Sequence, residues 1–133
     1  MPILNVTLSI EPDAALSARV AASLSQLTAQ ILQKDAALTS IAIAHVDPAH
    51  WYIGGATLSQ QRKNSFFLDI VITDETNTAT QKAAYIDAVF NAMGELLGEL
   101  HEVSYIHVHD ARPAAWGYGG LTQQFRAVRK LLR

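Results

Sequence analysis

The fold is decided by a short stretch that occurs twice in the chain, WYIGG at residues 51–55 and WGYGG at residues 116–120. Each copy has a tryptophan that is followed, three positions later, by a pair of glycines, which are typical turn residues. The second tryptophan lies 65 residues after the first. So regular an offset indicates an internal repeat of about half the chain, and the segments that lead into the two turns should therefore share one structure.

The segment before the first turn predicts a strand, a helix and a second strand. Through residues 2–10, large apolar residues alternate with Asn, Thr and Ser, which is the period of two of a half-buried strand. Between Ala14 and Lys34, leucine, valine and isoleucine recur every three or four positions, as in an amphipathic helix. Pro12 suits the first turn of this helix. The second strand is expected over LTSIAIAHVD, residues 38–47.

The segment before the second turn repeats this order. A strand is expected from Ser65 to Asp74, a helix from Thr78 to Leu100, and a strand over EVSYIHVHD, residues 102–110. Thr78 and Gln81 have the spacing of a capping box, in which the two side chains bond to each other's backbone N–H groups at the start of a helix.

Two β-α-β units predict an α+β fold in a single domain, residues 1–133, with the units at about 2–64 and 65–133. The two strands of each unit should be parallel, with a right-handed crossover. The units should merge into a four-stranded sheet with both helices on one face, which leaves the other face bare. We do not expect strands this apolar to expose that face to water, so several copies of the chain should close around it.

Composition excludes several classes of function. Half of the 133 residues are hydrophobic, the formal net charge is −2, and there is no cysteine. The chain has no cluster of basic residues with interleaved aromatics, which a nucleic-acid-binding surface would need. Without cysteine, disulfides, thiolate catalysis and cysteine-ligated metals are excluded. No G-x-G-x-x-G loop follows a strand, so a dinucleotide site is not supported. It also has neither a signal sequence nor an apolar stretch of about 18 residues. These features predict a cytoplasmic protein without a cofactor and without nucleic-acid or membrane partners.

Pro2 is an unusual residue at the start of a strand. Proline is tolerated there because its missing N–H has no ladder partner waiting for it, and this gives a purely structural interpretation. The functional interpretation begins with Met1, since aminopeptidases usually remove a methionine that precedes a small residue. The exposed secondary amine would have a reference pKa near about 7.7–8.0, and burial would lower it. A neutral amine of this kind can act as a general base.

These residues resemble the tautomerase superfamily, whose members begin with a catalytic proline. The stretches PILNVTLSI, LTSIAIAHVD and HWYIGGATLSQQRK are similar to 4-oxalocrotonate tautomerase in order and spacing, and YIHVHDARPAAWGYGG is similar to the last strand and turn of macrophage migration inhibitory factor. The resemblance covers nearly the whole chain. It implies a homotrimer of tandem units, with Pro2 as the catalytic base in a pocket at each subunit boundary.

The resemblance also implies candidate substrate-binding residues. Two arginines that hold carboxylates in 4-oxalocrotonate tautomerase fall at Pro12 and Ala42, so both of these cations are missing here. Lys34 falls where macrophage migration inhibitory factor has a pocket lysine, although a cation at a helix C-terminus is also favoured by the helix dipole. Tyr105 and His107 fall at its pocket tyrosine and asparagine, and their spacing puts them on one face of the last strand.

Arg112 and Trp116 complete the candidate binding set. Arg112 lies in the turn after the last strand, where its planar fork would suit a carboxylate, and the alternative is a surface arginine paired with Asp110. Trp116 would wall an apolar pocket or pack in the core or an interface. His107 and His109 have a metal-ligand spacing, but without a carboxylate cluster we expect no metal. We expect the basic C-terminal segment to pack over a neighbouring copy rather than to do chemistry, and its cations are Arg126, Arg129, Lys130 and Arg133.

The sequence therefore predicts a cofactor-free tautomerase in which Pro2 moves a proton on a small enol or 2-oxo acid. Tyr105, His107 and Arg112 would position the substrate and polarise its carbonyl. Two alternatives remain open at this point. One is a trimeric binding or signalling protein with vestigial activity, and the other is a hydratase or dehalogenase of an unsaturated acid.

Overall fold

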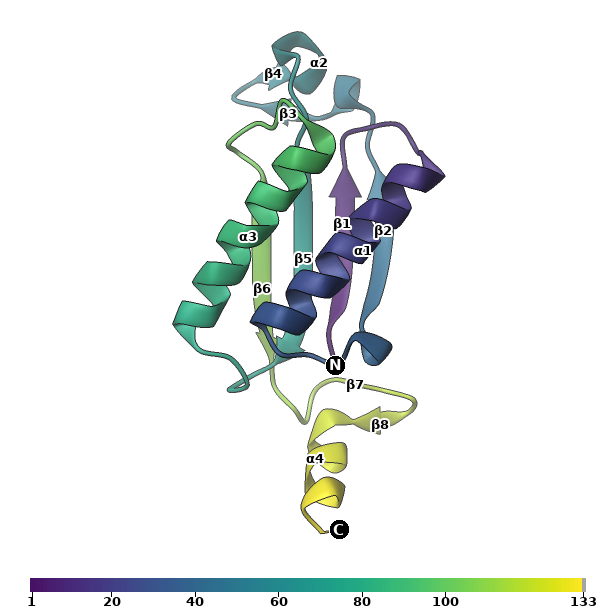
Figure 1. Ribbon diagram of the computed structural model, residues 1–133, viewed down its shortest axis with the longest axis vertical. Helices are drawn as coiled ribbons and strands as arrows, with labels where there is room; N and C mark the ends of the chain where they lie inside the picture. Colours follow the sequence, from purple (N-terminus) through teal and green to yellow (C-terminus); the bar gives the residue numbers. More distant parts are fainter. Residues whose placement is uncertain (133) are drawn as a thin grey trace.

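Both repeats fold in the predicted order of strand, helix and strand (Figure 1). The structure is a computed structural model, and it describes residues 1–132. The first unit consists of β1 (Ile3–Leu8), α1 (Ala14–Ile31) and β2 (Ser40–His45), with a short 3-10 helix at Ala36–Leu38. The second unit consists of β5 (Phe66–Thr73), α3 (Ala79–Leu97) and β6 (Tyr105–Ala111).

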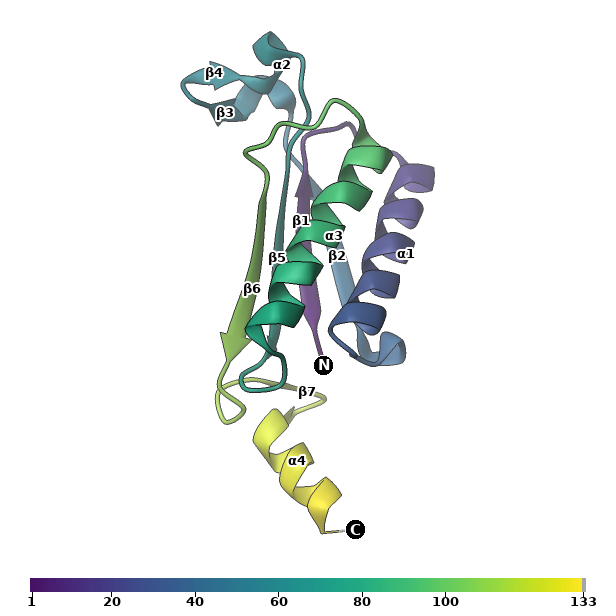
Figure 2. The ribbon, with the colours of Figure 1, turned by 60° about the vertical axis from the view of Figure 1, so that its left-hand side comes forward.

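The four long strands form one sheet in the order β2-β1-β5-β6. Strands are parallel within each unit, and β1 pairs with β5 antiparallel at the centre of the sheet. Both long helices lie on the same face, as Figures 1 and 2 show from two directions. The predicted α+β class, the four-stranded sheet and the placement of both helices on one face are thus confirmed.

The core lies between the sheet and the two helices. Alternate residues of the central strands are fully buried, and they meet the buried stripe of each helix. Complete burial of one such side chain contributes roughly 1.5–3 kcal/mol, so this layer supplies most of the drive for folding. Its members from the central strands are Leu4, Val6, Leu8, Phe66, Leu68, Ile70 and Ile72, and those from the helices are Val20, Leu24, Tyr85, Val89 and Met93.

The helix boundaries follow from local backbone chemistry. Asp13 caps α1, with its carboxylate accepting the N–H groups of Ala15 at 2.9 Å and Leu16 at 3.2 Å. Pro12 therefore precedes the cap, which corrects its predicted place in the first turn. The predicted capping box of Thr78 and Gln81 is present at the start of α3.

Both long helices end three residues before their predicted limits, because a residue with positive φ follows each of them. After α1 this residue is Gln33, with φ of 57°, and after α3 it is Gly98, with φ of 67°. A right-handed helix cannot continue through such a conformation.

Each W-x-x-G-G stretch forms a two-stranded hairpin that leads into a helix, which is more structure than the predicted turn. The glycines have positive φ in both copies, as a tight hairpin connection requires. After each hairpin the first helical N–H bonds back to the tryptophan carbonyl, at 2.9 Å in the first copy and 3.0 Å in the second. The two segments are β3 (Tyr52–Ile53), β4 (Ala56–Thr57) and α2 (Leu58–Gln61), and β7 (Gly117–Tyr118), β8 (Leu121–Thr122) and α4 (Gln123–Leu131).

These hairpin–helix segments lie at opposite ends of the sheet (Figure 1). The first ends quickly, because Arg62 has a left-handed backbone and stops α2 after one turn. The second continues as α4, which extends away from the sheet at the end where the chain begins (Figure 2). Both the chain start and the C-terminal helix are therefore found at one end of the sheet.

The second face of the sheet carries no helix within residues 1–132 (Figure 2). It is more polar than the sequence suggested, since the strands alternate and direct their largest apolar residues to the core. Asn5, Asp69 and His107 form a polar row across three paired strands, while Ile3, Phe67 and Tyr105 are exposed apolar residues on the same face. No helix among the described residues has the length and apolar character needed to cross a membrane.

Candidate functional site

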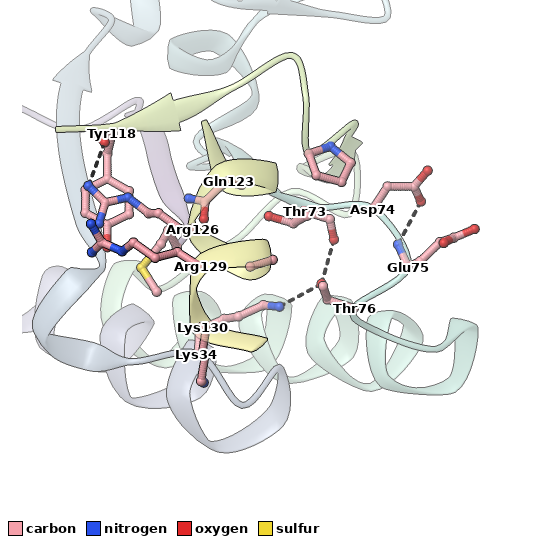
Figure 3. A pocket seen from close by; sticks show the side chains of 13 residues that line it. Lys34, Thr73, Asp74, Glu75, Thr76, Tyr118, Gln123, Arg126, Arg129 and Lys130 are labelled. Atoms are coloured by element: carbon pink, nitrogen blue, oxygen red, sulfur yellow. Dashed lines mark hydrogen bonds between the residues drawn. The ribbon is translucent and has the colours of Figure 1, made fainter. Parts of the chain in front are cut away.

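A cavity of about 670 Å³ lies beside the start of the chain. Its lining comes from Met1, from Lys34 just after α1, from residues 73–76 after β5, and from the C-terminal hairpin with α4 (Figure 3). This volume lies in the range of about 300–1,000 Å³ that is usual for small-molecule sites. The cavity is therefore large enough to hold a small organic substrate at the N-terminus.

The N-terminal amine lies in a partly desolvated and positively charged setting. Pro2 is buried at the entry to β1, where its carbonyl accepts the N–H of Ser40 at 3.2 Å. Burial lowers the pKa of the Met1 amine below its ordinary value of 8.0, and the charge of Lys34 lowers it further, whereas Asp35 opposes both effects. Met1 lines the cavity and Pro2 does not, so the proline nitrogen is joined to the cavity wall through Met1.

Lys34 is held in place by a short chain of hydrogen bonds. Its ammonium donates to the hydroxyl of Thr76 at 2.8 Å, and that hydroxyl donates to the carbonyl of Thr73 at 2.6 Å. Burial lowers the pKa of Lys34, while Asp110 acts in the opposite direction. The predicted pocket lysine thus lines the same cavity as the chain start, and its position is fixed by the turn that follows β5.

The C-terminal helix supplies cations to the cavity that the sequence interpretation assigned to a contact with another copy. Arg126, Arg129 and Lys130 line the cavity together with Gln123. Their spacing of three and four residues puts them on one side of α4. This spacing is the feature of the sequence from which their common position could have been predicted. Arg133, which was predicted to belong with them, lies outside the described residues. The apolar side of the helix is exposed and consists of Phe125, Val128, Leu131 and Leu132.

Arg126 is fixed by the hairpin that precedes α4. Its guanidinium donates to the carbonyl of Tyr118 at 3.0 Å and lies over the tyrosine ring, 3.9 Å from the ring centre. Gly119 makes this position accessible, because a Cβ there would come within 2.8 Å of the guanidinium. The turn glycine and the tyrosine therefore determine where this cation stands.

Two other predicted residues lie near the cavity without lining it. Trp116 donates from its indole nitrogen to the hydroxyl of Thr73 at 3.3 Å, so it supports one wall from behind. Arg112 is exposed in the turn after β6. Asp110 forms its ion pair with Lys82, at 2.6 Å, which removes the predicted alternative of a pair between Arg112 and Asp110.

Tyr105 and His107 lie far from Pro2 within one chain. Tyr105 on β6 pairs with Phe67 on β5, and Phe67 pairs with Thr7 on β1. Tyr105 is therefore two strands away from β1, at the level of Thr7, which lies five residues after Pro2. At about 3.3 Å per residue and 4.8 Å per strand, this separation is well over 15 Å. Tyr105 is 67% exposed on the edge strand β6. His107 is paired through Asp69 with Asn5, three positions along β1 from Pro2 and two strands away, so the same spacings separate it from the proline by more than about 10 Å. One chain alone therefore does not bring these two candidates to the proline.

His107 instead contacts a carboxylate on the uncovered face. Its Nδ1 atom is 3.0 Å from Oδ1 of Asp69, although this oxygen has no aligned hydrogen-bond donor within residues 1–132. The ring of His109 lies 5.5 Å from that of His107. No group of three or more histidine, aspartate and glutamate side chains in the described part of the chain is arranged to hold a metal ion.

Solved structures share this fold over almost their whole length. Native fused 4-OT is 22% identical, with a TM-score of 0.79, covering 94% of this chain and 98% of its own. A second fused 4-OT, R7, solved as an asymmetric trimer, is 17% identical with a TM-score of 0.82 and covers the same shares. MIF2 of Leishmania major is 16% identical with a TM-score of 0.75, covering 92% of this chain and 97% of its own. No protein-family model and no curated protein sequence matches the chain.

The chain is thus an α+β protein of two fused β-α-β units with a cavity at its N-terminus. The same fold occurs in fused 4-OT and in MIF2 of Leishmania major. The resemblance predicted from the sequence is confirmed at the level of the fold.

Proposed function

We propose that the protein is a cofactor-free tautomerase that interconverts the keto and enol forms of a small enol or 2-oxo acid. The observation that carries this proposal is the chain start at the wall of the cavity, where burial and Lys34 both lower the pKa of the terminal amine. With Met1 removed, the amine of Pro2 would be neutral at a pH where an exposed amine is protonated. It could accept the hydroxyl proton of the enol and deliver a proton to the carbon.

Lys34 has a second part in this mechanism. The carbonyl oxygen gains negative charge as the proton leaves the carbon, and a nearby ammonium stabilises that charge. The bonds from Lys34 to Thr76 and from Thr76 to Thr73 hold the ammonium in place before the substrate arrives. A preorganised cation of this kind stabilises the enolate without the reorganisation that water would need.

We propose that the active form is a homotrimer. Two fused 4-OT proteins with this fold were solved as an asymmetric and as a symmetric trimer. The exposed Ile3 and Phe67 on the uncovered face, together with the exposed apolar side of α4, provide surface for contacts between copies. In such an assembly Tyr105 and His107 would serve the proline site of a neighbouring copy, since within one chain they lie too far away.

The proposal is tested with the purified protein. Intact mass shows whether Met1 has been removed, and ketonisation of a panel of small enols is followed before and after Pro2→Ala. We expect Pro2→Ala to reduce the rate by at least a hundredfold, within the range of about 10²–10⁴ for general bases. Equal rates for the two forms would refute the role of Pro2. A trimer that binds small acids without any turnover would instead favour the binding-protein alternative.

One of the similar structures suggests a test of the alternative function, a hydratase or dehalogenase of an unsaturated acid. Pt0534, which shares this fold with a TM-score of 0.81 and 15% identity, was solved after inactivation by 2-oxo-3-pentynoate. Incubation of this protein with the same acetylenic acid, followed by peptide mass analysis, asks whether the N-terminal proline becomes modified. Hydration of the acid without loss of activity would favour the hydratase alternative, whereas a covalent adduct on Pro2 would support a reactive amine.

A further inference from the structure

Two arginines on α4 face the cavity without a counter-charge. Arg126 and Arg129 are three positions apart on the helix, and both line the cavity. The pair of Lys82 with Asp110 and the contact of His107 with Asp69 are the ones found within residues 1–132, so neither arginine takes part in an ion pair there. Residues three apart are neighbours on the helix surface, so the two positive charges repel each other. An anion between them would remove this repulsion.

The acidic residues of the cavity do not neutralise the arginines. Figure 3 shows Arg126 and Arg129 reaching toward Tyr118, with Asp74 and Glu75 on the opposite side and directed away from them. The Asp74 carboxylate instead accepts the N–H of Glu75 at 2.9 Å. The cavity is thus polarised, with a cationic side on α4 and an acidic rim after β5.

Two buried donors on the same helix also lack acceptors. Nε of Arg126 and Nε2 of Gln123 are shielded from solvent and have no hydrogen-bond partner within residues 1–132. A guanidinium has only donors, so the missing partner of Arg126 must be an acceptor. Buried polar groups in folded proteins are normally satisfied, and an acceptor bound beside Gln123 and Arg126 is one way to satisfy these two donors.

We propose that Gln123, Arg126 and Arg129 form a carboxylate-binding wall that selects acidic substrates at the Pro2 site. A carboxylate presents several acceptor positions in one plane, which matches the fork of a guanidinium. These residues belong to the C-terminal helix, whereas the sequence resemblance places the expected cations at Pro12 and Ala42. The proposal rests on the proposed function only for the identity of the substrate. The binding of acids to these residues can be measured without any turnover.

The test therefore uses the full-length Pro2→Ala protein, in which the proline secondary amine that is the proposed base is replaced. Titration calorimetry measures the binding of three probes of equal carbon number, namely adipate, hexanoate and 1,6-hexanediol. We expect both acids to bind more tightly than the neutral diol. Arg129→Gln is the main variant, because the Arg129 guanidinium lies 5.9 Å from the centre of the Phe125 ring and its side chain makes no hydrogen bond or ion pair within residues 1–132 on which the fold depends. It should weaken the binding of both acids about tenfold and leave the diol unchanged.

Two variants separate a specific site from a general effect of charge. Arg19→Gln removes one exposed positive charge from α1, away from the cavity, and should leave the binding of all three probes unchanged. Arg129→Lys keeps the charge but loses the fork, so it should recover only part of the lost affinity. Circular dichroism confirms that each variant is folded.

Three results would overturn the proposal. They are equal binding of the acids and the diol by the Pro2→Ala protein, unchanged acid binding after Arg129→Gln, and an equal loss after Arg19→Gln. The outcome is independent of the test of Pro2 itself. Loss of acid binding in Arg129→Gln combined with full turnover by Pro2→Ala would keep the carboxylate wall and reject Pro2 as the base. Unchanged acid binding in Arg129→Gln combined with loss of turnover in Pro2→Ala would do the opposite.

Discussion

Replacing Tyr85 with phenylalanine should make the stability of the protein less sensitive to alkali. The Tyr85 hydroxyl is fully buried between α1 and α3, 2.8 Å from the hydroxyl of Thr28. Thr28 donates its own proton to the carbonyl of Leu24 at 2.7 Å, so Tyr85 is the donor in the pair. Burial raises the pKa of Tyr85 to about 12, and the hydrogen bond that the Thr28 hydroxyl can turn to donate to the ionised tyrosine only partly opposes this rise.

The sign and the size of the effect follow from this shift. The unfolded tyrosine loses its proton near pH 10 while the folded one keeps it to about pH 12, so the contribution is complete below pH 10 and is lost as the pH rises through 12. Two pKa units correspond to about 2.7 kcal/mol, of which about 1.4 kcal/mol is lost by pH 11. At pH 8, Tyr85→Phe should cost about 1 kcal/mol, because it removes one hydrogen bond and leaves Thr28 bonded to Leu24.

The wild type should therefore be the more stable protein at pH 8 by about 1 kcal/mol, and the difference should vanish or slightly reverse at pH 11. Urea unfolding of both proteins at the two pH values measures this, with the chain concentration held fixed because assembly would also affect stability. Tyr52→Phe is the matched control, since Tyr52 is 64% exposed in the folded chain. A difference between wild type and Tyr85→Phe that is the same at both pH values would refute the reasoning.

Three further changes test other parts of the structure. Lys34→Gln removes a charge that adds to the effect of burial in lowering the pKa of the terminal amine, so that pKa should rise. Because the amine acts as a base only when neutral, the acid limb of the rate profile, where the rate increases with pH, should move to higher pH; an unmoved limb would exclude the influence of Lys34. Gln61→Ala removes side-chain bonds to the carbonyls of Ile53 and Ala56, at 2.8 and 3.0 Å, and should expose the first hairpin to limited proteolysis before the sheet unfolds. Leu68→Ala, in the fully buried centre of β5, should lower the free energy of unfolding by about 2–5 kcal/mol in chemical denaturation, and a loss below about 1 kcal/mol would contradict its placement in the core.

The fold was predictable because each of its main elements has a strong local signal. The apolar residues alternate in β1 and recur every three or four positions in α1, so each element has one apolar face that is buried. The recurrence of Trp51 as Trp116 indicates that the second half of the chain folds like the first. The ends of the helices were less predictable. Residues of ordinary type, such as Gln33, adopt a positive φ for reasons of tertiary context rather than composition.

The site was only partly predictable because it is assembled from distant segments. Lys34 was found through a resemblance, whereas the arginines of α4 were assigned to a contact between copies. The sequence of an amphipathic helix predicts an apolar side and a basic side. It does not predict which of the two sides faces the cavity. The direction in which α4 leaves the hairpin decides this, and that direction depends on the positive φ of Gly119 and Gly120.

The two ends of the repeat are equivalent in topology but not in chemistry. Ile3 is the first residue of β1 that pairs with β2, and Phe67 is the first residue of β5 that pairs with β6. Ile3 and Phe67 are therefore equivalent, and the residue before Phe67, Phe66, corresponds to Pro2. Phe66 lies inside the chain, and its nitrogen is an amide whatever happens to Met1. The side chain of Gln61 also fills this end, bonding to the first hairpin and to His101 at 3.0 Å. The position in the second unit that corresponds to Pro2 therefore offers no free amine, and the cations of α4 lie at the Pro2 end of the sheet.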